Sequence, residues 1–242
     1  MTRILFGLLS EIALTEGVEA QDFPAQRASL VIEVDGMYAE TRGETGLAAM
    51  SPAVRAAIGK VERHRLVPPA QASYAYRNHP LPIGAGQTIS QPYIVALSAD
   101  LLAPKPGDVV LEVGTGSGYQ AAVLAEIVKQ VYSIERVESL GRSAAERLAE
   151  LGYRNVEVRI GDGYAGWPER APFDGIVVTA AAPQVPAALV AQLKPGARMV
   201  IPVGESGGLQ YLKVLVKRAD GGYDERDVIP VRFVPLVPKS GG

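Results

Sequence analysis

Three glycines at alternate positions form the stretch of this chain best suited to hold a ligand. Gly114, Gly116 and Gly118 follow the apolar run 109–113. Glycine lets a backbone turn sharply and approach a ligand closely, and a helix that begins next presents free N–H groups. The spacing is G-x-G-x-G, which differs from the dinucleotide pattern G-x-G-x-x-G. We therefore expect a ligand that lies across the loop rather than a pyrophosphate.

Polar residues stand where three further apolar runs end. Glu135 lies 21 residues after Gly114, at a place where an acid can accept hydrogen bonds from both ribose hydroxyls. Asp162, within 161–163, could reach an adenine amino group, and Thr179 ends the next run. The methionine part, ribose and adenine of S-adenosylmethionine fit this set of groups.

Each of these signals has a simpler interpretation when it stands alone. A glycine-rich segment after a strand is often only a tight turn. Glu135 alone would be a solvated strand end, and Asp162 alone would be a turn residue. Their occurrence at successive strand ends favours a ligand site over three coincidences.

From residue 108 onward, apolar runs alternate with segments of helical character, which predicts an α/β fold with a mostly parallel sheet and helices on both faces. Such sheets bind ligands at the carboxyl ends of their strands, near the point where strand order reverses. That point lies at the glycines. The expected strands are 109–113, 131–135, 156–160, 173–179 and 199–203, followed by an antiparallel hairpin of 209–217 and 227–234. The expected helices are 119–129, 137–151 and 185–193.

The chain before residue 108 is less regular. Ser51 followed by Pro52 is typical of a helix start, and a second helix is expected over 91–102. Residues 1–45 show no clear pattern, although 30–34 could be a strand or the start of a helix and Asp35-Gly36 favours a turn. We expect an N-terminal extension over 1–45 and a catalytic domain over 46–242.

Composition excludes several kinds of chemistry. The chain has no cysteine, which removes disulfides, thiolate metal sites and cysteine nucleophiles, and its two histidines are too few for a histidine-rich metal site. We therefore expect no metal. The net charge of −2 provides no basic field for nucleic acid, and no stretch approaches the length of a membrane-spanning helix.

Several motifs together resemble the protein-L-isoaspartate O-methyltransferase family, over about residues 51–238. The segment 87–92, Gln-Thr-Ile-Ser-Gln-Pro, is specific to that family, whereas the glycine loop is shared by many methyltransferases. Further matches are 80–84, 114–119, 161–163, 171–174, 179–183, 192–196 and 233–236. The resemblance implies a Rossmann-like seven-stranded methyltransferase sheet. It also implies methylation of the free carboxylate of L-isoaspartyl residues in damaged proteins, which begins their repair through a succinimide.

The resemblance also assigns the site. Ser90 corresponds to the family's catalytic serine, and Thr88 could share its role of aiming the substrate carboxylate. From spacing alone, Ser90 is favoured as the N-cap of the helix that follows it. The expected cofactor contacts are Glu112, Gly114, Thr115, Gly116, Ser117, Gly118, Glu135, Arg136, Gly161, Asp162, Gly163 and Thr179. A carboxylate is already ionised at neutral pH, so neither His64 nor His79 is needed as a base.

Three other functions remain open from the sequence: a methyltransferase for a small molecule or a nucleic acid base, a nicotinamide-dependent oxidoreductase, and a binding module without turnover. We expect a cytoplasmic monomer with no nucleic-acid or membrane partner. Export is the alternative, because Arg3, the apolar run 4–9 and Val18-Glu19-Ala20 resemble parts of a signal peptide.

Overall fold

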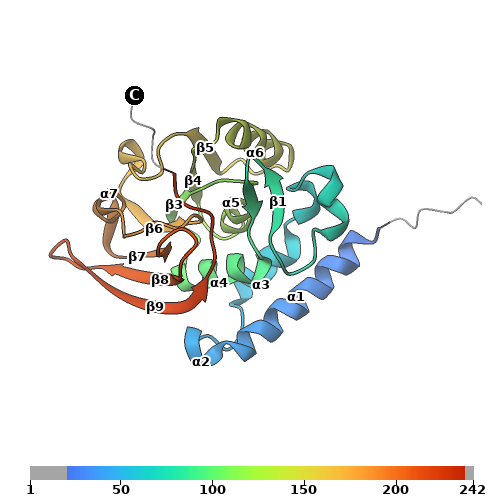
Figure 1. The fold of residues 1–242 in the computed structure, drawn as a ribbon, viewed down its shortest axis with the longest axis horizontal. Coiled ribbons are helices and arrows are strands. Elements are labelled where there is room, and N and C mark those ends of the chain that lie inside the picture. The colour runs from blue at the N-terminus through green and yellow to red at the C-terminus, as the bar shows by residue number, and fades with distance from the viewer. Residues whose placement is uncertain (1–20, 238–242) are drawn as a thin grey trace, which may run out of the picture.

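A computed structural model describes residues 21–237 of the chain (Figure 1). The signal-like features of residues 1–20 lie outside this range. The helical elements are α1 (Phe23–Glu40), α2 (Arg42–Thr45), α3 (Pro52–Lys60), η1 (Arg63–Arg65), η2 (Pro69–Tyr74), α4 (Pro92–Leu102), α5 (Tyr119–Ala125), α6 (Glu138–Glu150), η3 (Pro168–Arg170) and α7 (Ala187–Ala191). The strands are β1 (Leu81–Gly84), β2 (Gln87–Ile89), β3 (Val109–Val113), β4 (Gln130–Glu135), β5 (Val156–Ile160), β6 (Phe173–Val178), β7 (Leu193–Val203), β8 (Gln210–Lys217) and β9 (Tyr223–Val231).

Seven strands form the main sheet in the order β5-β4-β3-β6-β7-β8-β9. The first five are mutually parallel, whereas β8 and β9 pair antiparallel at one edge. The chain runs outward from β3 to β5 and then returns to the other side of β3 as β6. Strand order therefore reverses between β3 and β6, and this α/β arrangement with its C-terminal hairpin is the expected one. A ligand crevice is expected at the carboxyl ends of these two strands.

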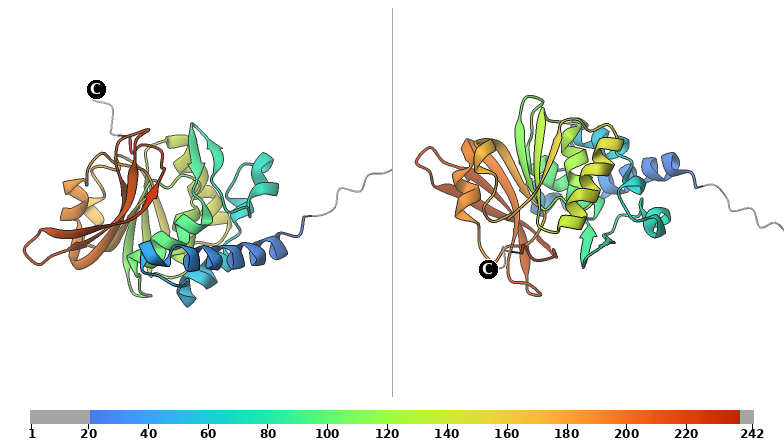
Figure 2. Two further views of the ribbon diagram at one scale, coloured as in Figure 1. Left: turned by 60° about the horizontal axis from the view of Figure 1, so that its bottom comes forward. Right: turned by 90° about the horizontal axis from the view of Figure 1, so that it is seen from above.

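Alternate residues of the central strands enter two separate hydrophobic layers, because side chains of a strand point to opposite faces. Val110, Val177 and Val200 pack in the layer that contains α1, α3, α4 and α5. Leu111, Ile176 and Met199 pack in the other layer, with Trp167 and residues of α7. Helices thus cover both faces of the sheet, which Figure 2 shows from two directions.

The N-terminal region described by the structure is helical rather than irregular. Leu30, Val34 and Tyr38 recur at helical spacing, and each is at most 1% exposed. The Asp35-Gly36 pair lies inside α1 rather than in a turn, and Asp35 forms an ion pair with Arg55. Burial of one helix face has outweighed the local turn preference. Figure 2 shows α1 running beside the layer of α3 and α4.

Several element boundaries differ from expectation. The second hairpin strand begins at Tyr223 rather than 227, because its first residues are polar and exposed and show no apolar alternation. Strand β7 begins six residues early, at Leu193, which pairs with Phe173. The helix start at Ser51 is confirmed, since the Ser51 hydroxyl accepts a hydrogen bond from Val54 N at 3.3 Å.

Within residues 21–237, no helix has both the length and the apolar character needed to cross a membrane.

Candidate active site

The glycine loop follows β3 at the point where strand order reverses. Gly114, Gly116 and Gly118 have φ values of +100°, +53° and +88°, which side chains rarely adopt. A Cβ on Gly114 would also collide with the hydroxyl of Thr179 at the end of β6. That hydroxyl donates to the Gly114 carbonyl at 2.5 Å. The loop is therefore held across the crevice by a side chain from the neighbouring strand.

Glu135 ends β4 with its carboxylate turned toward the glycine loop. One carboxylate oxygen accepts from Gly116 N at 2.7 Å, and the other accepts from Val137 N at 2.8 Å. The residue is only 6% exposed. Each oxygen has a second lone pair, so the carboxylate can also accept hydrogen bonds from a pair of ligand hydroxyls.

A chain of three polar side chains lies beneath the same loop. The Thr115 and Ser133 hydroxyls lie 2.5 Å apart, and the Ser133 hydroxyl contacts the Glu112 carboxyl in a short hydrogen bond. Burial raises the pKa of the Glu112 carboxyl to about 8, although the Ser133 hydrogen bond opposes this. Burial thus favours the protonated form of the Glu112 carboxyl.

A first cavity opens over the loop. It is lined by residues 114–117 of the glycine loop together with Glu112, Glu135, Arg136, Gly163 and Thr179, and it also reaches Thr88 and Ser90. Gln120 Nε2 and Arg136 Nε belong to residues of its lining, and these buried atoms have no hydrogen-bond partner within the described chain. Buried polar atoms are rarely left unpaired in native proteins, so their presence here fits a polar ligand.

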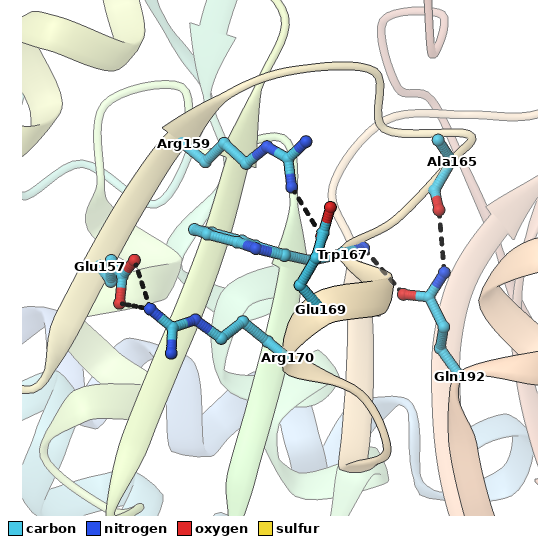
Figure 3. A network of polar contacts seen from close by, with 7 residues as sticks. All are labelled: Glu157, Arg159, Ala165, Trp167, Glu169, Arg170 and Gln192. Atoms are coloured by element: carbon cyan, nitrogen blue, oxygen red, sulfur yellow. Dashed lines mark hydrogen bonds and ion pairs between the residues drawn. The ribbon is translucent and has the colours of Figure 1, made fainter.

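The loop after β5 is fixed by a buried amide (Figure 3). The Gln192 side chain accepts from Trp167 N at 2.7 Å and donates to the Ala165 carbonyl at 2.8 Å. The Trp167 ring lies under the Arg159 guanidinium, 5.2 Å away. These contacts position the preceding Gly163, where a Cβ would come within 2.6 Å of the Val113 side chain.

The segment after β9 forms one side of the first cavity. Leu236 N donates to the Ala181 carbonyl at 2.7 Å, and Ala181 N donates to the Val234 carbonyl at 2.8 Å. The Tyr164 hydroxyl donates to the Leu236 carbonyl at 3.3 Å. Residues 234–237 therefore form a wall of the cavity, built by a part of the chain far from the glycine loop in sequence.

A second cavity adjoins the first. Thr88, Ser90, Thr179 and Val234 line both. Ser90 does not cap the helix that follows it, because the N-cap residue of α4 is Gln91 and Tyr93 N donates instead to Asn78 Oδ1 at 3.0 Å. The capping interpretation of Ser90 is thus wrong in this fold. Ser90 instead belongs to the wall that the two cavities share.

Arg63 supports the segment that leads into this wall. The residue is fully buried, and its guanidinium donates to the Ala75 carbonyl at 2.7 Å and to the His79 carbonyl at 3.2 Å. It also stacks over the Tyr119 ring at 4.7 Å. Burial lowers the pKa of Arg63 to about 10. This cation links the start of the helix after the glycine loop to the chain before β1.

The structure brings eleven of the fourteen expected site residues into the first cavity. They are Thr88, Ser90, Glu112, Gly114, Thr115, Gly116, Ser117, Glu135, Arg136, Gly163 and Thr179. Three others shape it from outside. Gly118 is the N-cap residue of α5, Gly161 N donates to the Glu135 carbonyl at 2.9 Å, and Asp162 Oδ1 accepts from Tyr164 N at 2.9 Å.

The sequence interpretation missed Gln120, Val137 and the 234–237 wall. Gln120 lies in the first turn of α5, where a polar residue among apolar neighbours was the available signal. Nothing local indicates that 234–237 reaches the glycine loop. Among residues 21–237, no group of three or more His, Cys, Asp or Glu residues could hold a metal ion.

Comparison with known proteins agrees with this geometry. The family model described as protein-L-isoaspartate(D-aspartate) O-methyltransferase matches residues 41–241. Protein-L-isoaspartate O-methyltransferase 1 of Cupriavidus necator is 55% identical over 230 residues, which cover 94% of this chain and 89% of that protein. The protein of the same name from Nitrosospira multiformis is 54% identical over 231 residues, covering 96% and 95%.

Solved structures give the same result. One described as a protein-L-isoaspartate O-methyltransferase superposes with a TM-score of 0.71 at 28% identity, covering 89% of this chain and 66%, just under two thirds, of that longer chain. A Plasmodium falciparum candidate for the same enzyme, in complex with S-adenosyl-L-homocysteine, has a TM-score of 0.70 at 24% identity, covering 90% and 99%, and supports the fold. With the family model spanning most of its length, this chain belongs to the protein-L-isoaspartate(D-aspartate) O-methyltransferase family.

Proposed function

We propose that this chain uses Ser90 to orient the free carboxylate of an L-isoaspartyl residue for methylation by S-adenosylmethionine. Carboxyl methylation of damaged proteins and peptides is the activity of its family, and S-adenosylmethionine is the family's methyl donor. The observation that carries the proposal is the position of Ser90 in the wall between the two cavities, with its hydroxyl not used as a helix cap.

The residues of the first cavity fit the donor. The glycine loop allows close backbone approach, and Glu135 can accept hydrogen bonds from ribose hydroxyls at its remaining lone pairs. Gln120 Nε2 and Arg136 Nε are unpaired donors, and they supply partners for a polar ligand. When bound, S-adenosylmethionine supplies a methyl group on a positively charged sulfur, and this sulfur keeps the bonding electron pair once a carboxylate oxygen has taken the methyl carbon.

Ser90 acts by positioning the acceptor. The substrate carboxylate is ionised at neutral pH, so no group of the chain needs to remove a proton. The Ser90 hydroxyl donates to one carboxylate oxygen and leaves the other aimed at the first cavity. Thr88 offers a second hydroxyl in the same wall. Holding two reactants in the correct geometry is a large source of rate acceleration.

The histidines support a mechanism without a proton shuttle. His64 lies 2.8 Å from the Tyr76 hydroxyl and stacks on Phe23, and burial lowers its pKa. His79 Nδ1 lies 2.9 Å from the Pro80 carbonyl. Neither residue is part of the lining of the two cavities.

The proposal is tested with labelled S-adenosylmethionine and two peptides of one sequence, containing either L-isoaspartate or aspartate. We expect base-labile methyl ester on the isoaspartyl peptide alone. Ser90→Ala should lower kcat by about 100- to 1000-fold, the range for loss of one positioned donor, with cofactor affinity unchanged. Ser29→Ala, on the exposed face of α1, is the matched control. Equal labelling of both peptides, or full activity in Ser90→Ala, would contradict the proposal.

We also propose that the chain acts as a cytoplasmic monomer on protein and peptide substrates, without a nucleic-acid partner. The net charge of −2 supports the last point. We further propose that residues 46–242 carry the catalytic machinery and that residues 1–45 precede it as an extension, which is supported by the start of the family match at residue 41. Light scattering during gel filtration tests the oligomeric state.

A further inference from the structure

One charged residue stands in the second cavity. Arg232 follows the end of β9, and it is the sole charged member of the described lining, which otherwise consists of apolar and uncharged polar residues such as Ile94, Gln91 and Phe233. Arg232 is exposed, and its side chain forms no hydrogen bond or ion pair within the part of the chain that the structure describes. Its positive charge is therefore available to a ligand.

The backbone that carries Arg232 is firmly held. Gln210 is 1% exposed, and its side chain accepts from Phe233 N at 2.7 Å and donates to the Phe233 carbonyl at 3.3 Å. The buried amide of Gln210 thus satisfies both backbone polar groups of Phe233, the residue that follows Arg232. The position of Arg232 is fixed by the fold even though its side chain is exposed.

The acidic residues of the same hairpin do not neutralise Arg232. Glu225 and Asp227 on β9 each form an ion pair with Lys213 of β8, at 2.9 Å in both cases. The nearest acids in sequence are therefore already matched by another cation. Charge complementarity at the second cavity points to an anionic group on whatever occupies it.

We propose that Arg232 determines substrate preference by pairing with a carboxylate on a residue next to the isoaspartyl residue. The inference rests on the proposed function, which places the acceptor carboxylate at Ser90, where the two cavities meet. Residues flanking the acceptor then extend along the second cavity past Arg232. If the guanidinium paired with the acceptor carboxylate, it would draw electron density from the attacking oxygen. If it pairs with a carboxylate on a flanking residue, the attacking oxygen keeps its reactivity.

The test compares three isoaspartyl peptides that differ only at one residue next to the isoaspartate, which is Glu, Gln or Lys. Each peptide is made in two versions, with that residue either before or after the isoaspartate. The wild-type protein should show the lowest KM for a Glu peptide. Arg232→Gln should raise that KM by about two- to fivefold, the size expected for an exposed ion pair, with kcat unchanged. The effect should shrink in high salt because screening weakens exposed pairs.

Charge reversal and a matched control sharpen the test. Arg232→Glu should make the Lys peptide the preferred substrate. Arg226→Gln removes an exposed arginine of β9 that is absent from the cavity lining, and it should leave all three KM values unchanged. Thermal unfolding of each variant checks that the fold is retained.

Two outcomes would overturn the inference. If Arg232→Gln raises the KM of all three peptides equally, the arginine contacts the acceptor carboxylate and does not distinguish the residue next to it. If it changes none of them, the arginine has no role in binding. Failure of the proposed function looks different, because the wild-type protein would then methylate no isoaspartyl peptide at all.

Discussion

Glu112 carries a carboxyl group into a fully buried position on a central strand. Because burial raises its pKa from 4.5 to about 8, the folded protein keeps a proton there that the unfolded chain loses above pH 4.5. Between these two values the unfolded state binds fewer protons, so stability falls as pH rises. Below pH 4.5 both states are protonated, and this contribution to stability is fully present.

Glu112→Gln should remove that dependence. We compare the free energies of unfolding of the variant and the wild-type protein, both without cofactor. The difference in favour of the variant should grow from pH 5 to pH 8.5 by an amount on the order of a few kcal/mol. Thermal unfolding at several pH values measures it. Val110→Ala, a packing change in the same strand, should shift the melting temperature by a similar amount at each pH. A constant difference between Glu112→Gln and the wild-type protein would show that the carboxyl does not titrate in this range.

At the scale of elements, the start of α4 depends on a residue from another segment. Gln91, the N-cap residue, makes no side-chain capping bond, and Asn78 supplies the acceptor for Tyr93 N. The Asn78 amide nitrogen in turn contacts the sulfur of Met37 on α1 at 2.8 Å. The helix that follows Ser90 is thus fixed by two segments that precede it in the chain.

Asn78→Ala should destabilise the protein by about 1 kcal/mol, the usual value of an N-cap hydrogen bond. It should also lower kcat, because Ser90 adjoins the loosened helix start. Asn78→Asp keeps the acceptor and adds a charge that the helix N-terminus favours, so it should retain both stability and activity. Urea unfolding and initial rates measure the two quantities. Equal losses in both variants would mean that the oxygen acceptor is not the important group.

Sequence patterns predicted the central strands, but they missed the 18-residue helix α1 and the short β1–β2 hairpin. The strands β3, β4, β5 and β6 have apolar residues flanked by turns, so their positions follow from composition alone. The β1–β2 hairpin has strands of four and three residues, too short for a periodic pattern. Ser90 shows the same limit for the site: spacing favours a cap, and only the fold reveals that Asn78 fills that role.

At the scale of the whole molecule, α1 belongs to the same hydrophobic layer as α3, α4 and α5. Leu30→Ala should therefore destabilise the protein by about 2–5 kcal/mol, as expected when a buried leucine is truncated. Ile32→Ala, on the same helix but 69% exposed, should change stability by less than about 0.5 kcal/mol. Denaturant unfolding compares them. Similar small effects in both would show that α1 does not take part in cooperative folding.

Contacts between distant parts of the chain explain why the site was only partly predictable. The glycine loop, Glu135 and Gly163 lie at the ends of consecutive parallel strands. The α/β fold class alone therefore predicts that they lie close together. The wall formed by 234–237 reaches the cavity through hydrogen bonds to Ala181 and Tyr164. No local pattern encodes such a pairing, because it depends on how the last hairpin crosses the sheet.

The shared wall of the two cavities has a consequence for the design of inhibitors. Thr88, Ser90, Thr179 and Val234 border both spaces, so the two cavities adjoin at these residues. A single molecule that joins an adenosine fragment to a carboxylate-bearing peptide fragment by a short linker could fill both. Once one fragment is bound, the other is held at a high effective concentration, and the joined molecule should bind far more tightly than either fragment.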